Sequence, residues 1–187
     1  MTTANPAVLV VSATTHEAAH VPPHLPLLVT GIGKVAAASA VAAALVTFNP
    51  DRVPVVVNIG TAGALRPGMS GLHLPGTVWN HDLDSDALAR LGLLADDVLQ
   101  LDGGDASVLA TGDTFVTEAA VVERLAARAS LVDMEGFAVA WASARAGARC
   151  RLVKHVSDNA DESAWDWLTA VEVSALALGQ WLSESYP

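Results

Sequence analysis

The chain of 187 residues is poor in several residue types, and each shortage excludes a class of protein. Its single cysteine, Cys150, rules out an internal disulfide framework and a zinc site built from thiolates. Charged residues make up only 16% of the chain, with 10 Lys and Arg against 20 Asp and Glu and a formal net charge of −10. Because no Lys/Arg cluster is present, we expect no nucleic acid and no anionic membrane as a partner.

Long hydrophobic runs and a leader pattern are also missing. The stretch "ASAVAAALVTF" (38–48) is too short and too rich in alanine to span a bilayer. The first residues carry no basic region and only a short apolar run, so we expect no signal peptide. These features favour a cytoplasmic protein.

Hydrophobic residues, in contrast, are abundant. They make up 52% of the chain, and the mean hydropathy is +0.40. Such a composition predicts elements that are buried on both sides, as in an α/β sheet with helices on both faces. The length suits one domain with a sizeable core, so we expect a single domain over residues 1–187.

Apolar runs and helical spacing alternate along most of the chain. We expect strands at 6–13, 25–30, 52–64, 72–82, 106–113, 129–134 and 150–158. We expect helices at about 34–47, 117–129, 135–147 and 163–184. The segment 84–105 is predicted to be rich in loops. This alternation predicts a three-layer sandwich around a mixed, mostly parallel sheet.

Chemistry-bearing residues gather where the predicted strands end. The strand ends read "SATTHE", "TGIGK", "NIGTAG", "TGDTF", "DME" and "SDNAD", and each of the six contains glycine or a carboxylate. Ligands of such sheets bind at the carboxyl ends of the strands. We therefore expect these six segments to build one site.

A glycine pattern and a histidine pattern could indicate a dinucleotide site and a metal site. "VTGIGKVA" fits the Gly-x-Gly-x-x-Ala fingerprint of dinucleotide binding, but Asp51 precedes the next strand and Asn58 occupies the place of the ribose-binding acid. His16, His20 and His24 have the spacing of a helical metal face, yet two prolines between the last two forbid one helix. We expect no metal and no cofactor.

Five of these stretches together resemble the nucleoside phosphorylase/nucleosidase superfamily, and within it the 5′-methylthioadenosine/S-adenosylhomocysteine nucleosidases. They are "GIGKVAAA", "NIGTAGAL", "ATGDTFV", "VDMEGFAVA" and "VSDNAD", and they occur in the order of the family. The resemblance implies cleavage of the N-glycosidic bond of a purine nucleoside by a homo-oligomer, commonly a dimer.

The resemblance also implies catalytic roles. Asp158 matches the general acid that protonates the purine at N7, which requires burial to raise its pKa towards neutrality. Glu135 matches the acid that holds the ribose hydroxyls, although a helix dipole would favour a carboxylate there in any case. Glu17 matches the acid that activates water, with a surface position on a mobile loop as the alternative. Asp158 could instead only form a turn before Asp161.

Six further residues are expected to bind the substrate. Met134 matches the methionine beneath the sugar, and Phe115 matches the aromatic residue that stacks on the base, with an ordinary core phenylalanine as the alternative. Thr61 is expected to contact the ribose or the water, and Gly63 lets backbone approach the ligand. The set is completed by Ser157 of the Ser-Asp motif and by Asp133, which is less direct.

Hydrolysis is favoured over phosphorolysis. Phosphate binding requires cations, and the chain has Asn58 and Thr15–Glu17 where phosphorylases place arginines. Arg66, just beyond the glycine loop, keeps a phosphorylase as an alternative. Asn159 keeps a 6-oxopurine as an alternative to adenine. The shortened segment between the "HD" and "TGD" motifs leaves the 5′ substituent open, so a futalosine-type nucleosidase and a non-catalytic nucleoside-binding protein also stay as alternatives.

Overall fold

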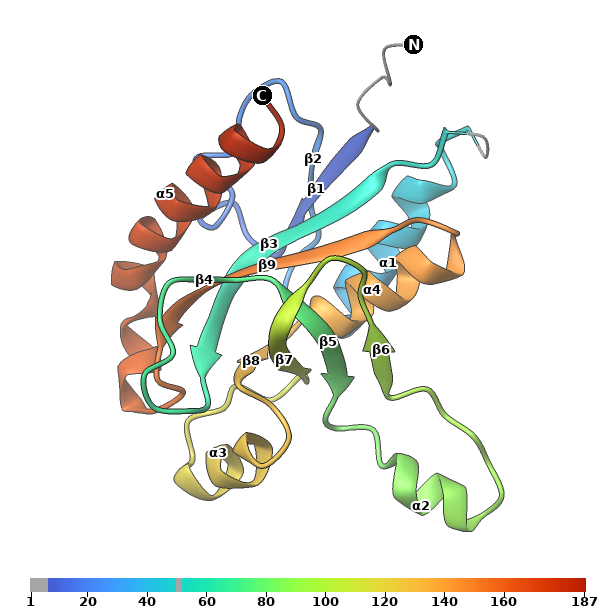
Figure 1. Cartoon of the computed structure of the whole chain (residues 1–187), viewed down its shortest axis with the longest axis vertical. Coiled ribbons are helices and arrows are strands. Elements are labelled where there is room, and N and C mark those ends of the chain that lie inside the picture. Colours follow the sequence, from blue (N-terminus) through green and yellow to red (C-terminus); the bar gives the residue numbers. More distant parts are fainter. Residues whose placement is uncertain (1–6, 50–51) are drawn as a thin grey trace.

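The computed structural model describes residues 7–49 and 52–187, and these form a nine-stranded sheet with helices on two sides (Figure 1). In chain order the strands are β1 (Val8–Ser12), β2 (Leu27–Val29), β3 (Val55–Ala64), β4 (Leu72–His73), β5 (Pro75–Asn80), β6 (Val98–Gln100), β7 (Asp105–Thr111), β8 (Leu131–Asp133) and β9 (Cys150–Asp158). The helices are α1 (Lys34–Leu45), α2 (Ser85–Arg90), α3 (Ala119–Ala126), α4 (Gly136–Arg145) and α5 (Trp167–Ser185), with a 3₁₀ turn η2 (Glu162–Asp166) before α5.

The sheet is mixed and mostly parallel. The pairs β1–β2, β1–β3, β3–β9, β5–β7 and β7–β8 are parallel. The pairs β3–β8, β4–β9 and β5–β6 are antiparallel. This confirms the predicted sheet.

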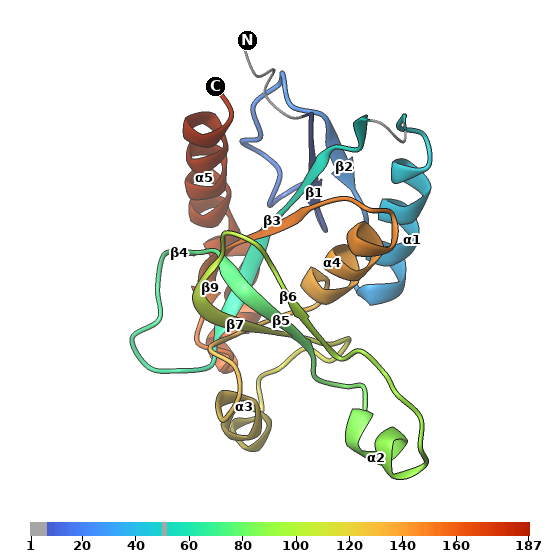
Figure 2. The same cartoon turned by 45° about the vertical axis from the view of Figure 1, so that its right-hand side comes forward.

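The helices cover the sheet from both sides. On β1, Leu9 and Val11 pack into the core beneath α1 and α4, whereas Val8 and Val10 pack into the core beneath α5. Figure 2 shows α1 and α4 side by side, away from α5. Because both faces of the central strands are buried, these strands are continuous apolar runs without polar alternation. The predicted three layers are confirmed.

The middle of the chain differs from the sequence prediction. The predicted strand 72–82 is two strands, because the backbone N–H of Leu74 donates to the carboxylate of Asp105 and Pro75 has no N–H to give. The predicted loop 84–105 contains α2 and β6. Asp84 caps α2 by accepting from the N–H of Ala87, a signal that the sequence already carried.

The ends of the predicted helices also shift. The last helix begins with η2, where Asp161 accepts from the N–H of Ser163, and turns into α5 only at Trp167. The helix predicted at 34–47 ends at Leu45. Within the described residues, no helix is long and apolar enough to cross a membrane.

Candidate active site

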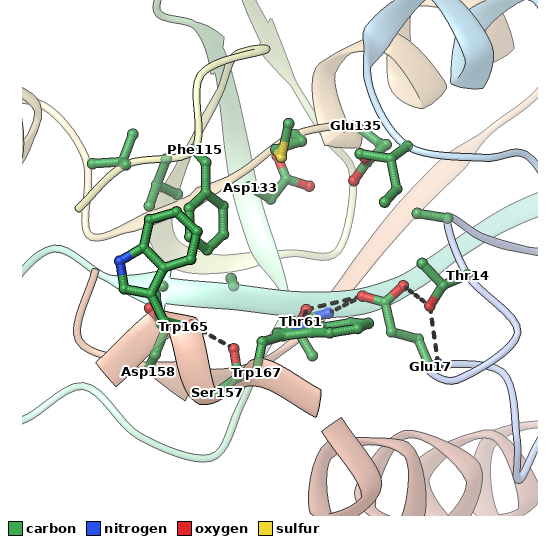
Figure 3. A pocket seen from close by; sticks show the side chains of 18 of the residues that line it. Thr14, Glu17, Thr61, Phe115, Asp133, Glu135, Ser157, Asp158, Trp165 and Trp167 are labelled. Carbon is green, nitrogen blue, oxygen red and sulfur yellow. Dashed lines mark hydrogen bonds between the residues drawn. The ribbon is translucent and has the colours of Figure 1, made fainter. Parts of the chain in front are cut away.

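The predicted strand ends meet around one cavity of about 320 Å³ (Figure 3). The cavity lies at the carboxyl ends of β1, β7, β8 and β9 and beside the last residues of β3. All nine predicted site residues line it: Glu17, Thr61, Gly63, Phe115, Asp133, Met134, Glu135, Ser157 and Asp158. This volume suits a small organic ligand such as a nucleoside.

Asp133 and Glu135, two residues apart, have different partners. The carboxylate of Asp133 accepts from the backbone N–H of Gly136 at 2.8 Å and from the hydroxyl of Thr111 at 2.6 Å. That hydroxyl in turn accepts from the N–H of Phe137. Asp133 and Thr111 therefore cap α4, and Glu135, although it is the N-cap residue, makes no side-chain capping bond.

Glu135 is instead bound to a distant part of the chain. Its Oε1 accepts from the backbone N–H of Gly33 at 2.7 Å, and the residue is only 8% exposed. Burial, and after it the charge of Asp133, raises the pKa of Glu135 to about 7, although the Gly33 bond and the charge of Lys154 act in the opposite direction. Glu135 can therefore exchange a proton near neutral pH.

Lys154, the buried partner of the site residue Asp133, was not predicted from the sequence. It is fully buried on β9, and its Nζ lies 2.9 Å from the carboxylate of Asp133. Burial alone would lower its pKa, but the charges of Asp133 and Glu135 outweigh that effect and hold the pKa above its usual value. The signal was a lysine inside the apolar run "RLVKHV", since a buried charge requires a partner.

Glu17 is buried in the site and is no surface residue of a loop. It is 5% exposed, and its Oε1 accepts from the backbone N–H of Thr61 at 2.8 Å and from the hydroxyl of Thr61 at 2.9 Å. Its Oε2 accepts from the hydroxyl of Thr14 at 2.8 Å. A side chain at Gly60 would come within 3.1 Å of Glu17 Oε1 and 3.2 Å of Lys154 Nζ, so glycine there leaves room for both charged groups.

Asp158 combines a local role with a place in the cavity. Its Oδ1 accepts from the backbone N–H of Ala160 at 2.8 Å, which closes the turn before Asp161, and its Oδ2 accepts from the hydroxyl of Ser157 at 2.7 Å. The turn therefore exists, but it leaves the half-buried carboxyl group facing the cavity. Asn159, the next residue in the chain, is exposed and does not line the cavity.

Two aromatic side chains, Phe115 and Trp165, line the end of the cavity opposite Glu17 and Glu135 (Figure 3). The rings of Phe115 and Trp165 lie 5.2 Å apart between centroids, and the residues are 45% and 72% exposed. Phe115 is therefore no core residue. We call Phe115 and Trp165 the aromatic end of the cavity (Figure 3). We call Glu17, Asp133 and Glu135, together with the buried Lys154 that pairs with Asp133, the acidic end.

The dinucleotide pattern forms the expected strand, glycine turn and helix, but its helix N-terminus is occupied. The N–H groups of Gly33 and Lys34 donate to the carboxylates of Glu135 and Asp113. These are the positions at which a pyrophosphate would bind. The chain's own acids thus take the place of a phosphate. Asp51 lies outside the described residues.

The three spaced histidines hold a loop against α5. His16 contacts the ring of Trp167, His20 pairs with Glu172, and His24 bonds to the carbonyl of Tyr186. Over residues 7–49 and 52–187 no group of three His, Cys, Asp or Glu side chains is arranged to hold a metal ion.

The residues relevant to phosphate binding lie elsewhere. Asn58 is buried and donates from its side chain to the carbonyl of Val11. Arg66 is turned away, because its Nε donates to the carbonyl of Ala126 beside α3. Among the described residues that line the cavity there is no arginine.

The chain belongs to the phosphorylase superfamily, whose sequence profile matches residues 14–92 and 105–184. The interruption falls in the segment that carries β6. Within this class, two curated relatives are 5′-methylthioadenosine/S-adenosylhomocysteine nucleosidases. That of Geobacillus thermodenitrificans is 32% identical over 161 residues, covering 73% of this chain and 67% of the relative. That of Exiguobacterium sp. is 28% identical over 164 residues, covering 74% and 69%.

Solved structures share the fold. A mutant nucleosidase of Helicobacter pylori with 5′-methylthioadenosine in its active site superimposes with a TM-score of 0.82, at 22% identity, over 97% of this chain and 98% of that chain. A futalosine hydrolase mutant of the same organism gives 0.82 at 22% identity, over 96% and 97%. At this identity the likeness shows the fold alone.

Proposed function

We propose that the protein hydrolyses the N-glycosidic bond of an adenosine-type purine nucleoside and releases the free base and the ribose moiety. The observation that carries the proposal is the meeting of three acids from separate segments, Glu17, Glu135 and Asp158, at one cavity. The curated relatives, which are named as nucleosidases, support the same reaction.

The charges of the site fit the charges of this reaction. Breaking the bond places positive charge on the sugar and negative charge on the departing base. At the acidic end three carboxyl groups face one ammonium group, so an electron-poor sugar is stabilised there. In this proposal Glu135 holds the ribose hydroxyls above Met134, and Asp133 keeps Lys154 and the start of α4 in place.

The two chemical steps fall to the remaining acids. Asp158 gives its proton to N7 of the purine, which Phe115 stacks against, and Ser157 orients the carboxyl group of Asp158. Glu17 takes a proton from the attacking water, with Thr61 and Thr14 fixing its orientation and Gly63 leaving the cavity floor open.

The experiment is chromatography of the base released from a nucleoside panel, with and without phosphate. The panel contains adenosine, 5′-methylthioadenosine, S-adenosylhomocysteine, inosine and futalosine. We expect release from adenine nucleosides in phosphate-free buffer, with no gain on adding phosphate, because no arginine lines the cavity. Release that requires phosphate would establish a phosphorylase instead. Tight adenine binding without release would establish a binding protein.

We propose further that the chain forms a homo-oligomer, with a dimer as the expected state, through the outer face of α1. Val35, Ser39, Ala42, Ala43 and Val46 are exposed there, and residues 35–46 include no charged side chain. A helix without a polar outer face is usually covered. Light scattering after size exclusion should show a dimer that Val35→Lys converts to monomer and that Ala127→Lys, exposed after α3, leaves intact.

The remaining expectations, on domains, location and partners, are also proposals. We propose that residues 1–187 act as one domain in the cytoplasm. We also propose that the protein has no nucleic-acid or membrane partner, because its net charge of −10 repels both. Limited proteolysis should release no stable fragment of the chain. After sedimentation with anionic vesicles or duplex DNA, the protein should stay in the supernatant.

A further inference from the structure

Trp167, the first residue of α5, is hydrogen-bonded to the residue that holds Glu17. Its indole Nε1 donates to the hydroxyl of Thr61 at 2.9 Å, although the two residues are 106 positions apart. The same hydroxyl donates to Glu17 Oε1 at 2.9 Å. The three side chains form a chain of hydrogen bonds along one wall of the cavity (Figure 3).

The direction of this chain follows from the chemistry of the groups. An indole N–H can only donate, so the hydroxyl of Thr61 must accept from Trp167. A hydroxyl has one proton, and with an acceptor site taken by Trp167 that proton is directed to Glu17. Glu17 Oε1 then accepts two hydrogen bonds from Thr61. Oε2 accepts one from Thr14 and can accept a further hydrogen bond.

Further contacts hold the loop of Glu17 against α5. The ring of His16, adjacent to Glu17, meets the ring of Trp167 edge-on at 6.1 Å between centroids. A side chain at Gly179 would collide with the carbonyl oxygen of His20, so the loop lies directly on the helix. The indole of Trp167 thus contacts both His16 of the loop and Thr61 of β3, and it can hold the loop in a fixed position against the strand.

We propose that Trp167 is a positioning residue, which orients the hydroxyl of Thr61 and through it the carboxylate of Glu17. The inference rests on the proposed function, in which Glu17 activates the attacking water. Trp167 acts through Thr61, so its effect must depend on the hydroxyl of Thr61.

The test is a set of matched variants assayed for base release. Trp167→Phe removes the N–H donor and should lower kcat about 5- to 30-fold, with KM within about twofold of wild type. Trp181→Phe, on the same helix but outside the cavity, should leave kcat and KM unchanged. Benzothienylalanine at position 167 keeps the ring volume without the N–H, so it should reproduce the loss even if the phenylalanine variant folds poorly.

Variants of Thr61 separate positioning from packing. In a Thr61→Ser background, which keeps the hydroxyl, Trp167→Phe should still lower kcat about 5- to 30-fold. In a Thr61→Val background, which removes it, the same substitution should change kcat less than about twofold. If the wild type is active, two results overturn this inference alone. One is an unchanged kcat in Trp167→Phe, and the other is an equal loss of kcat in the Thr61→Ser and Thr61→Val backgrounds. Absence of base release by the wild type overturns the proposed function as well.

Discussion

The acidic end of the cavity is buried and hydrogen-bonded within the chain, whereas the aromatic end is exposed. Glu17, Glu135 and Asp133 each accept at least one bond from another segment. The rings of Phe115 and Trp165 contact each other, and both residues are exposed. Changes at the acidic end should therefore affect folding together with activity, and changes at the aromatic end should affect binding alone.

The largest expected effect is that of Asp158→Asn, which separates chemistry from folding. Without the proton donor we expect turnover to fall about 10²- to 10⁴-fold. The asparagine carbonyl can still accept from the N–H of Ala160, so the turn should remain. Steady-state base release and urea unfolding measure the two effects, and turnover close to wild type would contradict the assignment.

Lys154→Met tests the acidic end as a structural unit. It leaves the carboxylate of Asp133 buried without its cation, so we expect the free energy of unfolding to fall by about 3–5 kcal/mol. Lys34→Met, which breaks the more exposed pair with Asp82, should cost no more than about 1 kcal/mol. Urea unfolding of both variants gives the comparison, and equal losses would refute it. Asp133→Asn added to Lys154→Met should restore part of the loss.

The pKa of Glu135 predicts a pH dependence of stability. Between 4.5, its ordinary value, and about 7, the folded protein binds a proton that the unfolded chain has released. The free energy of unfolding should therefore fall as the pH rises through this window. Glu135→Gln should flatten the slope by up to about 1.4 kcal/mol per pH unit. Urea unfolding at several pH values measures it, with the exposed Glu123→Gln as control. If Glu135→Gln leaves the slope unchanged, Glu135 of the folded protein is ionised throughout this pH window, which would contradict the raised pKa.

The smallest effect is expected at the aromatic end. Phe115→Leu keeps an apolar side chain but loses the stacking face, which is worth about 0.5–1.5 kcal/mol. We expect KM to rise about 2- to 10-fold, with the unfolding midpoint unchanged because Phe115 is half exposed. Initial rates over a range of nucleoside concentrations measure this. A loss of stability instead of affinity would mean that the aromatic end belongs to the core.

The features that could be predicted from the sequence are those for which a local pattern is enough. Continuous apolar strands predicted the buried sheet, and the six strand ends predicted a common site, because parallel strands bring their carboxyl ends to one edge. The ion pair of Lys154 could not be predicted, since a lysine within an apolar strand does not identify Asp133 as its partner. The break within residues 72–82 could not be predicted either, because it depends on Asp105, far along the chain.

The sequence by itself determined which side chains reach the cavity, because strand ends and glycine turns are set by short stretches of chain. Only the tertiary structure decided what each acid does there. Asp133 pairs with Lys154 on β9, Glu135 binds Gly33, 102 residues away, and Glu17 is held by Thr61, which Trp167 contacts across 106 residues. A carboxylate binds whichever donors packing brings close once water is excluded, and that choice is made only when the layers close.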